Sequence, residues 1–153
     1  MAAGVTAIRE ALETRLATYL GAGSRQVSVF AYRPEDLTGT YPAVCVEPGE
    51  GELGFVSYFE SMSNNGCALL RFEIQVFVSG RYIDAQRAMD AFLSAGSGFT
   101  SSILNAILAD PTLGGVVSTC RLLAASRPAQ TDDDGSVWVS RLPLDVYTMK
   151  VAA

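Results

Sequence analysis

The chain has 153 residues, of which 49% are hydrophobic and 18% are charged, and it carries a formal net charge of −5 with no histidine. A chain of this length can form a single domain, residues 1–153, whose buried core needs no stabilisation by disulfides or bound metal ions. The lack of histidine excludes Ser-His-Asp and Cys-His catalysis and histidine-ligated metals. The acidic balance argues against a nucleic-acid clamp or a polybasic membrane binder.

The first predicted element is an amphipathic helix over residues 5–20. Charged side chains at Arg9, Glu10, Glu13 and Arg15 lie off its apolar stripe and interrupt the apolar residues, so this segment does not resemble a signal peptide. No uncharged stretch there approaches the roughly 20 residues of a membrane span. We therefore expect a chain that is made and folds in the cytosol. The stripe repeats at steps of three and four residues: Val5, Ile8, Leu12, Leu16, Tyr19 and Leu20.

Two short strands are predicted next, over residues 26–32 and 41–47, with a turn at 33–36 between them. A long excursion follows at about residues 48–66, either an extended loop or a hairpin. Its first part is rich in glycine and acidic residues, and its second part has more aromatic surface than a loop usually carries. These acidic and aromatic residues are Glu50, Glu52, Phe55, Tyr58 and Phe59.

The clearest strand covers residues 70–79, where apolar and polar side chains alternate with the period of a sheet that buries one face. Phe77 alone breaks the polar side. A second helix follows, and a third begins at a cap of Ser101 or Ser102. The third helix stops at residues 110–111, because the residue before a proline is pushed out of the helical region.

The chain then returns to strands over residues 116–125 and 136–151, with a hairpin turn at 131–135 between them. The apolar residues of the last strand change face twice, which indicates bulges, and Pro143 places that stretch on an edge or at a bulge. This order of elements predicts an α+β fold. We expect a mainly antiparallel β-sheet with an N-terminal helix and two central helices packed on one face.

No catalytic constellation emerges from the polar residues. Lys150 is the sole lysine, which argues against Ser-Lys chemistry. Carboxylates cluster in two glycine-bearing loops, and such clusters are more often solvated turns than sites. The second cluster lacks the alternate-position ligands and the closing glutamate of a calcium loop. We therefore expect no enzyme, no cofactor and no metal site. The clusters are Glu47, Glu50 and Glu52, and Asp132, Asp133 and Asp134.

The three cysteines are too few and too scattered for a disulfide framework or a zinc site. Cys45 and Cys120 lie in strand-like runs, whereas Cys67 follows a turn and is the one most expected to be exposed. The pattern favours small buried hydrophobic side chains in a reducing cytosol over a reactive thiol.

Three segments, in this order along the chain, resemble one protein family. After the amphipathic N-terminal helix comes Tyr41-Pro42-Ala43-Val44-Cys45-Val46-Glu47-Pro48. The alternating strand then runs into Ala85-Gln86-Arg87-Ala88-Met89-Asp90-Ala91-Phe92-Leu93. The stretch from Ser102 to Val117 includes Asp110-Pro111-Thr112-Leu113-Gly114-Gly115. Together these segments are similar to the tail terminator proteins of long, flexible-tailed bacteriophages.

The resemblance implies a structural virion protein that is assembled in the host cytoplasm. Tail terminators form a hexameric ring that caps the growing tail tube, stops its polymerisation and joins the tail to the head connector. The implied partners are further copies of the chain, the tail-tube protein and a head-completion protein. DNA passes through the ring without sequence-specific binding, and no membrane is involved.

On this hypothesis the acidic loop residues Glu47, Glu50 and Glu52 are candidates for the lumen, where negative charge lets DNA slide. Two alternatives stay open: another neck component, such as a head-closure or connector protein, and a small-ligand binding module. The candidates for contacts between subunits or with the tube are Phe55, Tyr58, Phe59, Pro143, Asp132, Asp133 and Asp134.

Overall fold

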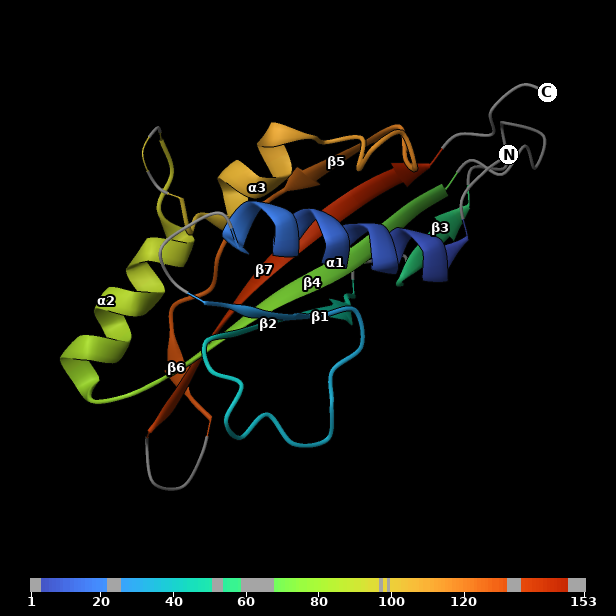
Figure 1. The fold of residues 1–153 in the computed structure, drawn as a ribbon. Coiled ribbons are helices and arrows are strands. Elements are labelled where there is room, and N and C mark those ends of the chain that lie inside the picture. Colours follow the sequence, from blue (N-terminus) through green and yellow to red (C-terminus); the bar gives the residue numbers. More distant parts are fainter. Residues whose placement is uncertain are drawn as a thin grey trace.

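The computed structural model describes residues 4–21, 26–50, 54–58, 68–96, 98, 100–131 and 136–148. These residues form three helices and seven strands (Figure 1). The helices are α1 (Val5–Gly21), α2 (Tyr82–Leu93) and α3 (Ile103–Ala109). The strands are β1 (Ser28–Phe30), β2 (Ala43–Pro48), β3 (Val56–Tyr58), β4 (Ala68–Ser79), β5 (Thr119–Leu122), β6 (Ala129–Gln130) and β7 (Val137–Thr148).

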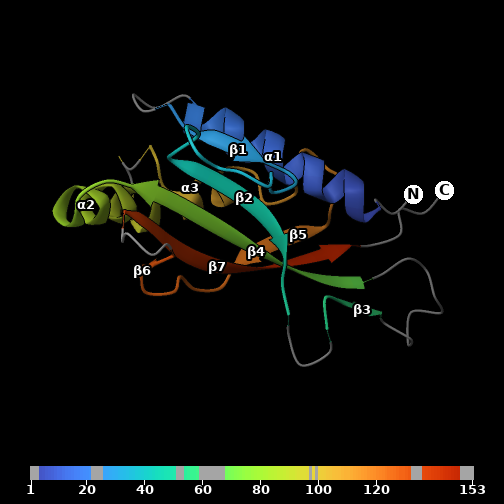
Figure 2. The same cartoon turned by 90° about the horizontal axis from the view of Figure 1, so that it is seen from below.

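All seven strands belong to one sheet, whose main order is β1-β2-β4-β7-β5. β3 pairs with the start of β4, and β6 pairs with the start of β7. β1 and β2 are parallel, and every other pair is antiparallel. The long strands β4 and β7 form the centre of the sheet, and β3 lies at the opposite end of the molecule from α2 (Figure 2). The predicted α+β class, with a mainly antiparallel sheet, is confirmed.

The three helices share one face of the sheet. The stripe of α1 is buried at Ile8, Leu12, Leu16 and Leu20, as its three- and four-residue spacing predicts. It packs in one cluster with side chains from α2, α3 and the even-numbered residues of β4. The cap of α3 is Ser102, whose Oγ accepts a hydrogen bond from the backbone N–H of Asn105 at 3.1 Å. These helices therefore cover one face and leave the other to the loops.

A second, smaller apolar cluster lies on the opposite face of the sheet. The loop between β1 and β2 supplies its cover, the buried Leu37. This cluster explains Phe77, which is 3% exposed although the alternation placed it on the polar side. Both faces are thus buried at this end of the sheet. The members of the cluster are Leu37, Ala43, Cys45, Phe77, Val137 and Val139.

The prediction of bulges in the last strand is wrong. β7 pairs with β4 without interruption, from Thr148 opposite Ala68 to Val137 opposite Ser79. One apparent change of face arises because the odd-numbered Val137 and Val139 belong to the second cluster, whereas the even-numbered residues face the helices. Apolar residues on both faces of a regular strand therefore imitate a bulge in the sequence pattern.

The prediction for Pro143 is also corrected, because β7 is an interior strand and its register has no bulge at this residue. The carbonyl oxygen of Pro143 accepts a hydrogen bond from the N–H of Leu123 at 2.9 Å. In a strand the nitrogen and carbonyl of one residue point to the same side, so the missing N–H of Pro143 faces away from β4. β5 has already ended at Leu122 on that side. Proline therefore removes no bond from the central ladder.

Candidate functional site

The acidic residues predicted to line a lumen are spread over β2 and the residues after it. Glu47 is half-buried on the sheet face opposite the helices, in register with Glu73 of β4. Glu50 is exposed beyond the strand, and Glu52 lies outside the described residues. Gly49 holds this corner close to β4, since a Cβ there would lie 2.8 Å from the carbonyl oxygen of Arg71.

The open face of the sheet carries a strip of charged side chains next to the second apolar cluster. Glu73 is its best-satisfied member: its Oε1 accepts from Nε2 of Gln75 at 2.7 Å and lies 3.6 Å from Nε of Arg141. On the next row, Asp145 is opposite both Arg71 and Arg121. We call Glu47, Arg71, Glu73, Arg141 and Asp145 the charged strip.

Two atoms of the charged strip are buried without a hydrogen-bond partner, Oε1 of Glu47 and Nε of Arg71. Such groups usually find a partner, because an unpaired buried polar atom costs about 1–3 kcal/mol and more when charged. Both atoms are covered within the chain, so a partner would pair with the remaining, accessible atoms of these half-buried side chains. The strip is therefore a candidate surface for protein contact.

The predicted aromatic contact residues are only partly described. Phe55 is half-buried and packs edge-on against Phe72, with ring centroids 5.2 Å apart and an interplanar angle of 83°. The backbone of Tyr58 pairs with Ala68 at the end of β3. Phe59 lies outside the described residues, as do Asp132, Asp133 and Asp134. Part of the Phe55 ring is therefore used within the chain, and its role between subunits stays a prediction.

Pro143 lies on the open face, in register with Glu73. Its side chain is exposed, so it borders the charged strip directly. The structure thus brings together one predicted contact residue, Pro143, and one predicted lumen residue, Glu47, on either side of Glu73. The alternation in β4 marked its polar face, but only strand pairing shows which residues of β2 and β7 lie beside that face.

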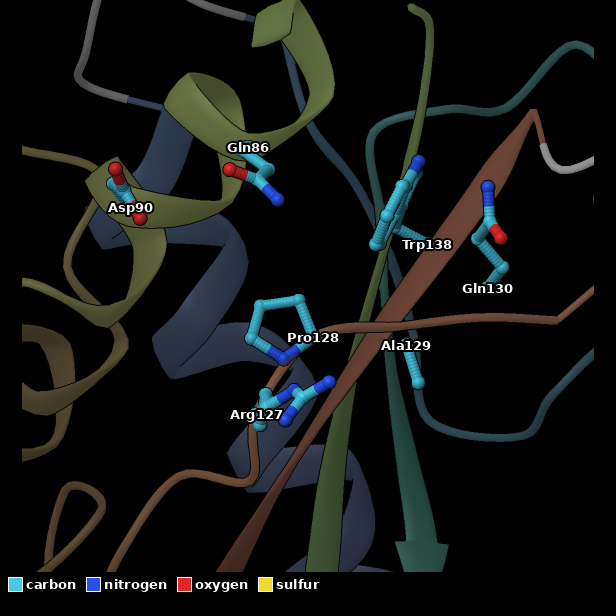
Figure 3. A pocket seen from close by; sticks show the side chains of 7 residues that line it. All are labelled: Gln86, Asp90, Arg127, Pro128, Ala129, Gln130 and Trp138. Atoms are coloured by element: carbon cyan, nitrogen blue, oxygen red, sulfur yellow. The ribbon is translucent and has the colours of Figure 1, made fainter. Parts of the chain in front are cut away.

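A pocket of about 570 Å³ lies between α2 and β6 (Figure 3). Gln86 and Asp90 reach it from α2, while Arg127 and Pro128 come from the segment before β6. Trp138 of β7 completes the lining together with Ala129 and Gln130. Sequence reasoning missed this pocket, because its polar residues come from three separate elements and share no motif.

The two described cysteines are buried and chemically quiet. Burial raises the pKa of the Cys45 thiol from its ordinary value of 9.0 to about 11, and that of Cys120 to about 12. Nearby carboxylates, Glu47 and Asp110 respectively, add to the shift by disfavouring a thiolate. The prediction of small buried side chains is confirmed for these two, and Cys67 lies outside the described residues.

Comparison of the chain with protein-family models and with curated proteins gives no match. Within the described ranges, no helix is both long enough and apolar enough to cross a membrane. The same ranges hold no group of three or more Cys, Asp or Glu residues placed to bind a metal ion. Surface geometry and the sequence resemblance therefore carry the functional proposal.

Proposed function

We propose that this chain is a virion protein of the tail terminator type, which forms a ring on the end of a phage tail tube. In this role it stops tube polymerisation and joins the tail to a head-completion protein, and DNA passes through the ring. The ordered resemblance of three segments supports this proposal. The fold is compatible with it, since helices cover a single face of the sheet and the charged strip of the second face has no helix over it.

The observation that carries the proposal is the charged strip on the open face. Glu47 and Arg71 each hold a buried polar atom without a partner, on a face that no helix covers. Catalytic sites concentrate perturbed groups in a pocket, whereas this arrangement spreads its charges over several strands, beside the second apolar cluster, and an apolar area with polar residues around it is typical of protein interfaces. Assembly with other proteins is the function that such a surface supports best.

Electron microscopy of negatively stained samples tests the proposal. The purified chain is mixed with the tail-tube protein encoded in the same genome while that protein polymerises. We expect closed rings at tube ends and shorter tubes than in the sample without the chain. Tubes of unchanged length with bare ends would contradict the proposal. Binding to portal or adaptor proteins without binding to tubes would instead favour the alternative of a head-closure or connector protein.

The role of the acidic residues is tested by charge removal. In a ring with an acidic lumen, the triple change Glu47→Gln, Glu50→Gln and Glu52→Gln should raise affinity for DNA by removing repulsion of phosphates. A filter-binding assay on assembled rings at low salt measures this change. The matched control is Glu10→Gln with Asp84→Asn, two exposed acids outside this loop. Equal DNA binding by the two variants would contradict a lumen role.

The pocket between α2 and β6 favours a second candidate function, a small-ligand binding module. Its volume of about 570 Å³ falls in the range typical of ligand sites, and Asp90 and Arg127 provide opposite charges. A thermal-shift screen against charged metabolites tests this function. A stabilising compound whose effect is lost in Arg127→Ala would support it, and a screen without stabilisation would leave the ring proposal in place.

A further inference from the structure

The pocket between α2 and β6 holds two opposite charges that have no partner among the described residues. Asp90 on α2 and Arg127 on the facing segment are both exposed. No hydrogen bond or ion pair joins either side chain to another residue that the structure describes. A partner surface that presents a cation and an anion close together could pair with both of these charges.

Apolar surface extends the pocket along α2. A neighbouring hollow of about 190 Å³ lies between the end of α2 and the segment after β5, where Leu93 and Leu123 face it. Leu123 is 42% exposed, and Ile83, which is 62% exposed, lies one turn before Gln86 of the pocket wall. Apolar side chains thus border the charged pocket at two sides, which is the usual composition of a protein contact site.

The loop between β1 and β2, which covers part of the open face of the sheet, presents the complementary charges. Arg33 and Glu35 are exposed and two residues apart, and Glu35 has no hydrogen bond or ion pair to any described residue. The guanidinium of Arg33 lies 5.0 Å from the ring centroid of Phe77. The loop therefore offers one cation and one anion, the same two signs that the pocket presents.

This loop is held firmly in place. The backbone N–H of Ala31 donates to Oε2 of Glu13 at 3.0 Å, which fixes its start to α1. Oδ1 of Asp36 accepts from the N–H of Thr38 at 2.8 Å, and the buried Leu37 anchors the loop in the second apolar cluster. A loop that is ordered before contact loses little entropy on binding.

The end of the loop at Ala43 and the pocket residue Ala129 belong to one row of paired residues. This row runs from Ser28 at the β1 edge through Ala43, Phe77 and Val139 to Ala129 at the β6 edge. The loop ends at Ala43, and Ala129 lines the pocket. Rotation about the axis of a closed ring does not move a residue along that axis. Two different surfaces of one chain can therefore meet in the ring only when they lie at the same position along the axis. When the ring axis runs along the strands, the residues of this row all lie at about the same position along the axis.

We propose that the loop of residues 33–36 in one copy docks into the pocket between α2 and β6 of the next copy. Glu35 pairs with Arg127 of the neighbouring copy, and Arg33 lies toward its Asp90. The contact is head-to-tail, because the loop and the pocket are different surfaces of the chain. This inference rests on the proposed ring, and it names the surfaces that close the ring.

Charge reversal tests the docking. Arg127→Glu and Glu35→Arg should each weaken self-association at least about tenfold, and the double variant should recover most of the wild-type affinity. Mass photometry and sedimentation velocity measure the assembly. Two controls repeat each charge change outside the contact: Arg87→Glu on α2 and Glu10→Arg on α1, both at exposed positions. Circular dichroism confirms that every variant is folded.

A second measurement does not depend on charge. In a Cys67→Ser background, mixed oxidation of a Glu35→Cys variant and an Arg127→Cys variant should give disulfide-linked dimers, whereas Glu10→Cys with Arg127→Cys should not. The docking proposal is wrong if the wild-type chain forms rings, both charge-reversal variants form them equally well, and no crosslink appears. This result would leave the ring proposal unaffected. A wild-type chain that stays monomeric even with tail-tube protein would overturn the ring proposal and the docking with it. A small molecule held in the pocket of assembled rings would also overturn the docking.

Discussion

The two faces of the sheet are stabilised in different ways. On one face, three helices bury a continuous cluster that includes Phe72, Phe92 and Leu144. On the other, Leu37 of the β1–β2 loop forms a small cluster with five buried side chains of β2, β4 and β7 at one end, and the charged strip occupies the strands beyond them. The first face provides the stability of the fold, and the second retains polar surface for contacts. On the proposed function, one face of the sheet stabilises the fold and the other serves recognition.

The largest effect is expected on the helix-covered face. Phe92→Ala removes a fully buried ring from the main cluster, and we expect a loss of about 4 kcal/mol in the free energy of unfolding. Urea denaturation monitored by circular dichroism measures this loss. Ile83→Ala, an exposed position on the same helix, is the control and should change stability little. Similar losses at both positions would contradict the packing described for α2.

A smaller effect is expected on the opposite face. Phe77→Ala removes a buried ring from the second cluster, and we expect a loss of about 3 kcal/mol because the loop can partly collapse into the space. The same urea titration measures it. Phe77→Leu, which keeps most of the volume, should lose less. A loss greater than that of Phe92→Ala would reverse the ranking of the two faces.

The pH dependence of stability also compares the two faces of the sheet. Cys45 belongs to the second cluster and Cys120 to the main one. Their folded-state pKa values, about 11 and about 12, lie above the ordinary 9.0, so the unfolded chain releases these protons first. Stability from these groups is present below pH 9 and is lost as the pH rises toward 11 and 12.

As the pH rises from 8 to 10, ionisation of each thiol in the unfolded chain should therefore lower the free energy of unfolding by about 1 kcal/mol. Urea titrations across this range measure the slope, and the Cys45→Ala/Cys120→Ala variant is the control because it lacks both groups. Equal slopes for the wild type and this variant would show that the thiols ionise as easily in the folded protein as in the unfolded chain.

The smallest effect is expected at the ion pair of the charged strip. The side chains of Arg141 and Glu73 are 60% and 29% exposed, so solvent screens their attraction. A double-mutant cycle with Arg141→Ala and Glu73→Ala should give a coupling energy of about 0.5 kcal/mol that decreases in 1 M salt. A coupling above about 2 kcal/mol, or one insensitive to salt, would show that the strip stabilises the fold itself.

Local patterns predicted most of the elements correctly. The stripe of α1, the alternation in β4 and the stop of α3 before Pro111 all follow from neighbours within a few residues. The last strand was interpreted less well, because Val137 and Val139 are buried by Leu37, a residue about 100 positions away. A contact over that distance in sequence leaves no periodic signal in the strand itself.

The candidate surfaces divide in the same way. Glu47 and Pro143 could be singled out from the sequence as an acid near a glycine-rich loop and a proline within a strand. Their placement on either side of Glu73 depends on the pairing of three strands. The pocket that joins Asp90 to Arg127 could not be predicted, since α2 and the segment before β6 meet only after the sheet has formed.

The sequence by itself determined the α+β class, the amphipathic helices, the acidic net charge and the exclusion of histidine chemistry. These properties depend on composition and on short-range periodicity, which the chain carries before it folds. Only the tertiary structure decided which polar residues share a face, which apolar residues form the second cluster, and that β7 runs without a bulge. Strand register sets all three, and it is fixed by contacts between residues far apart in the chain.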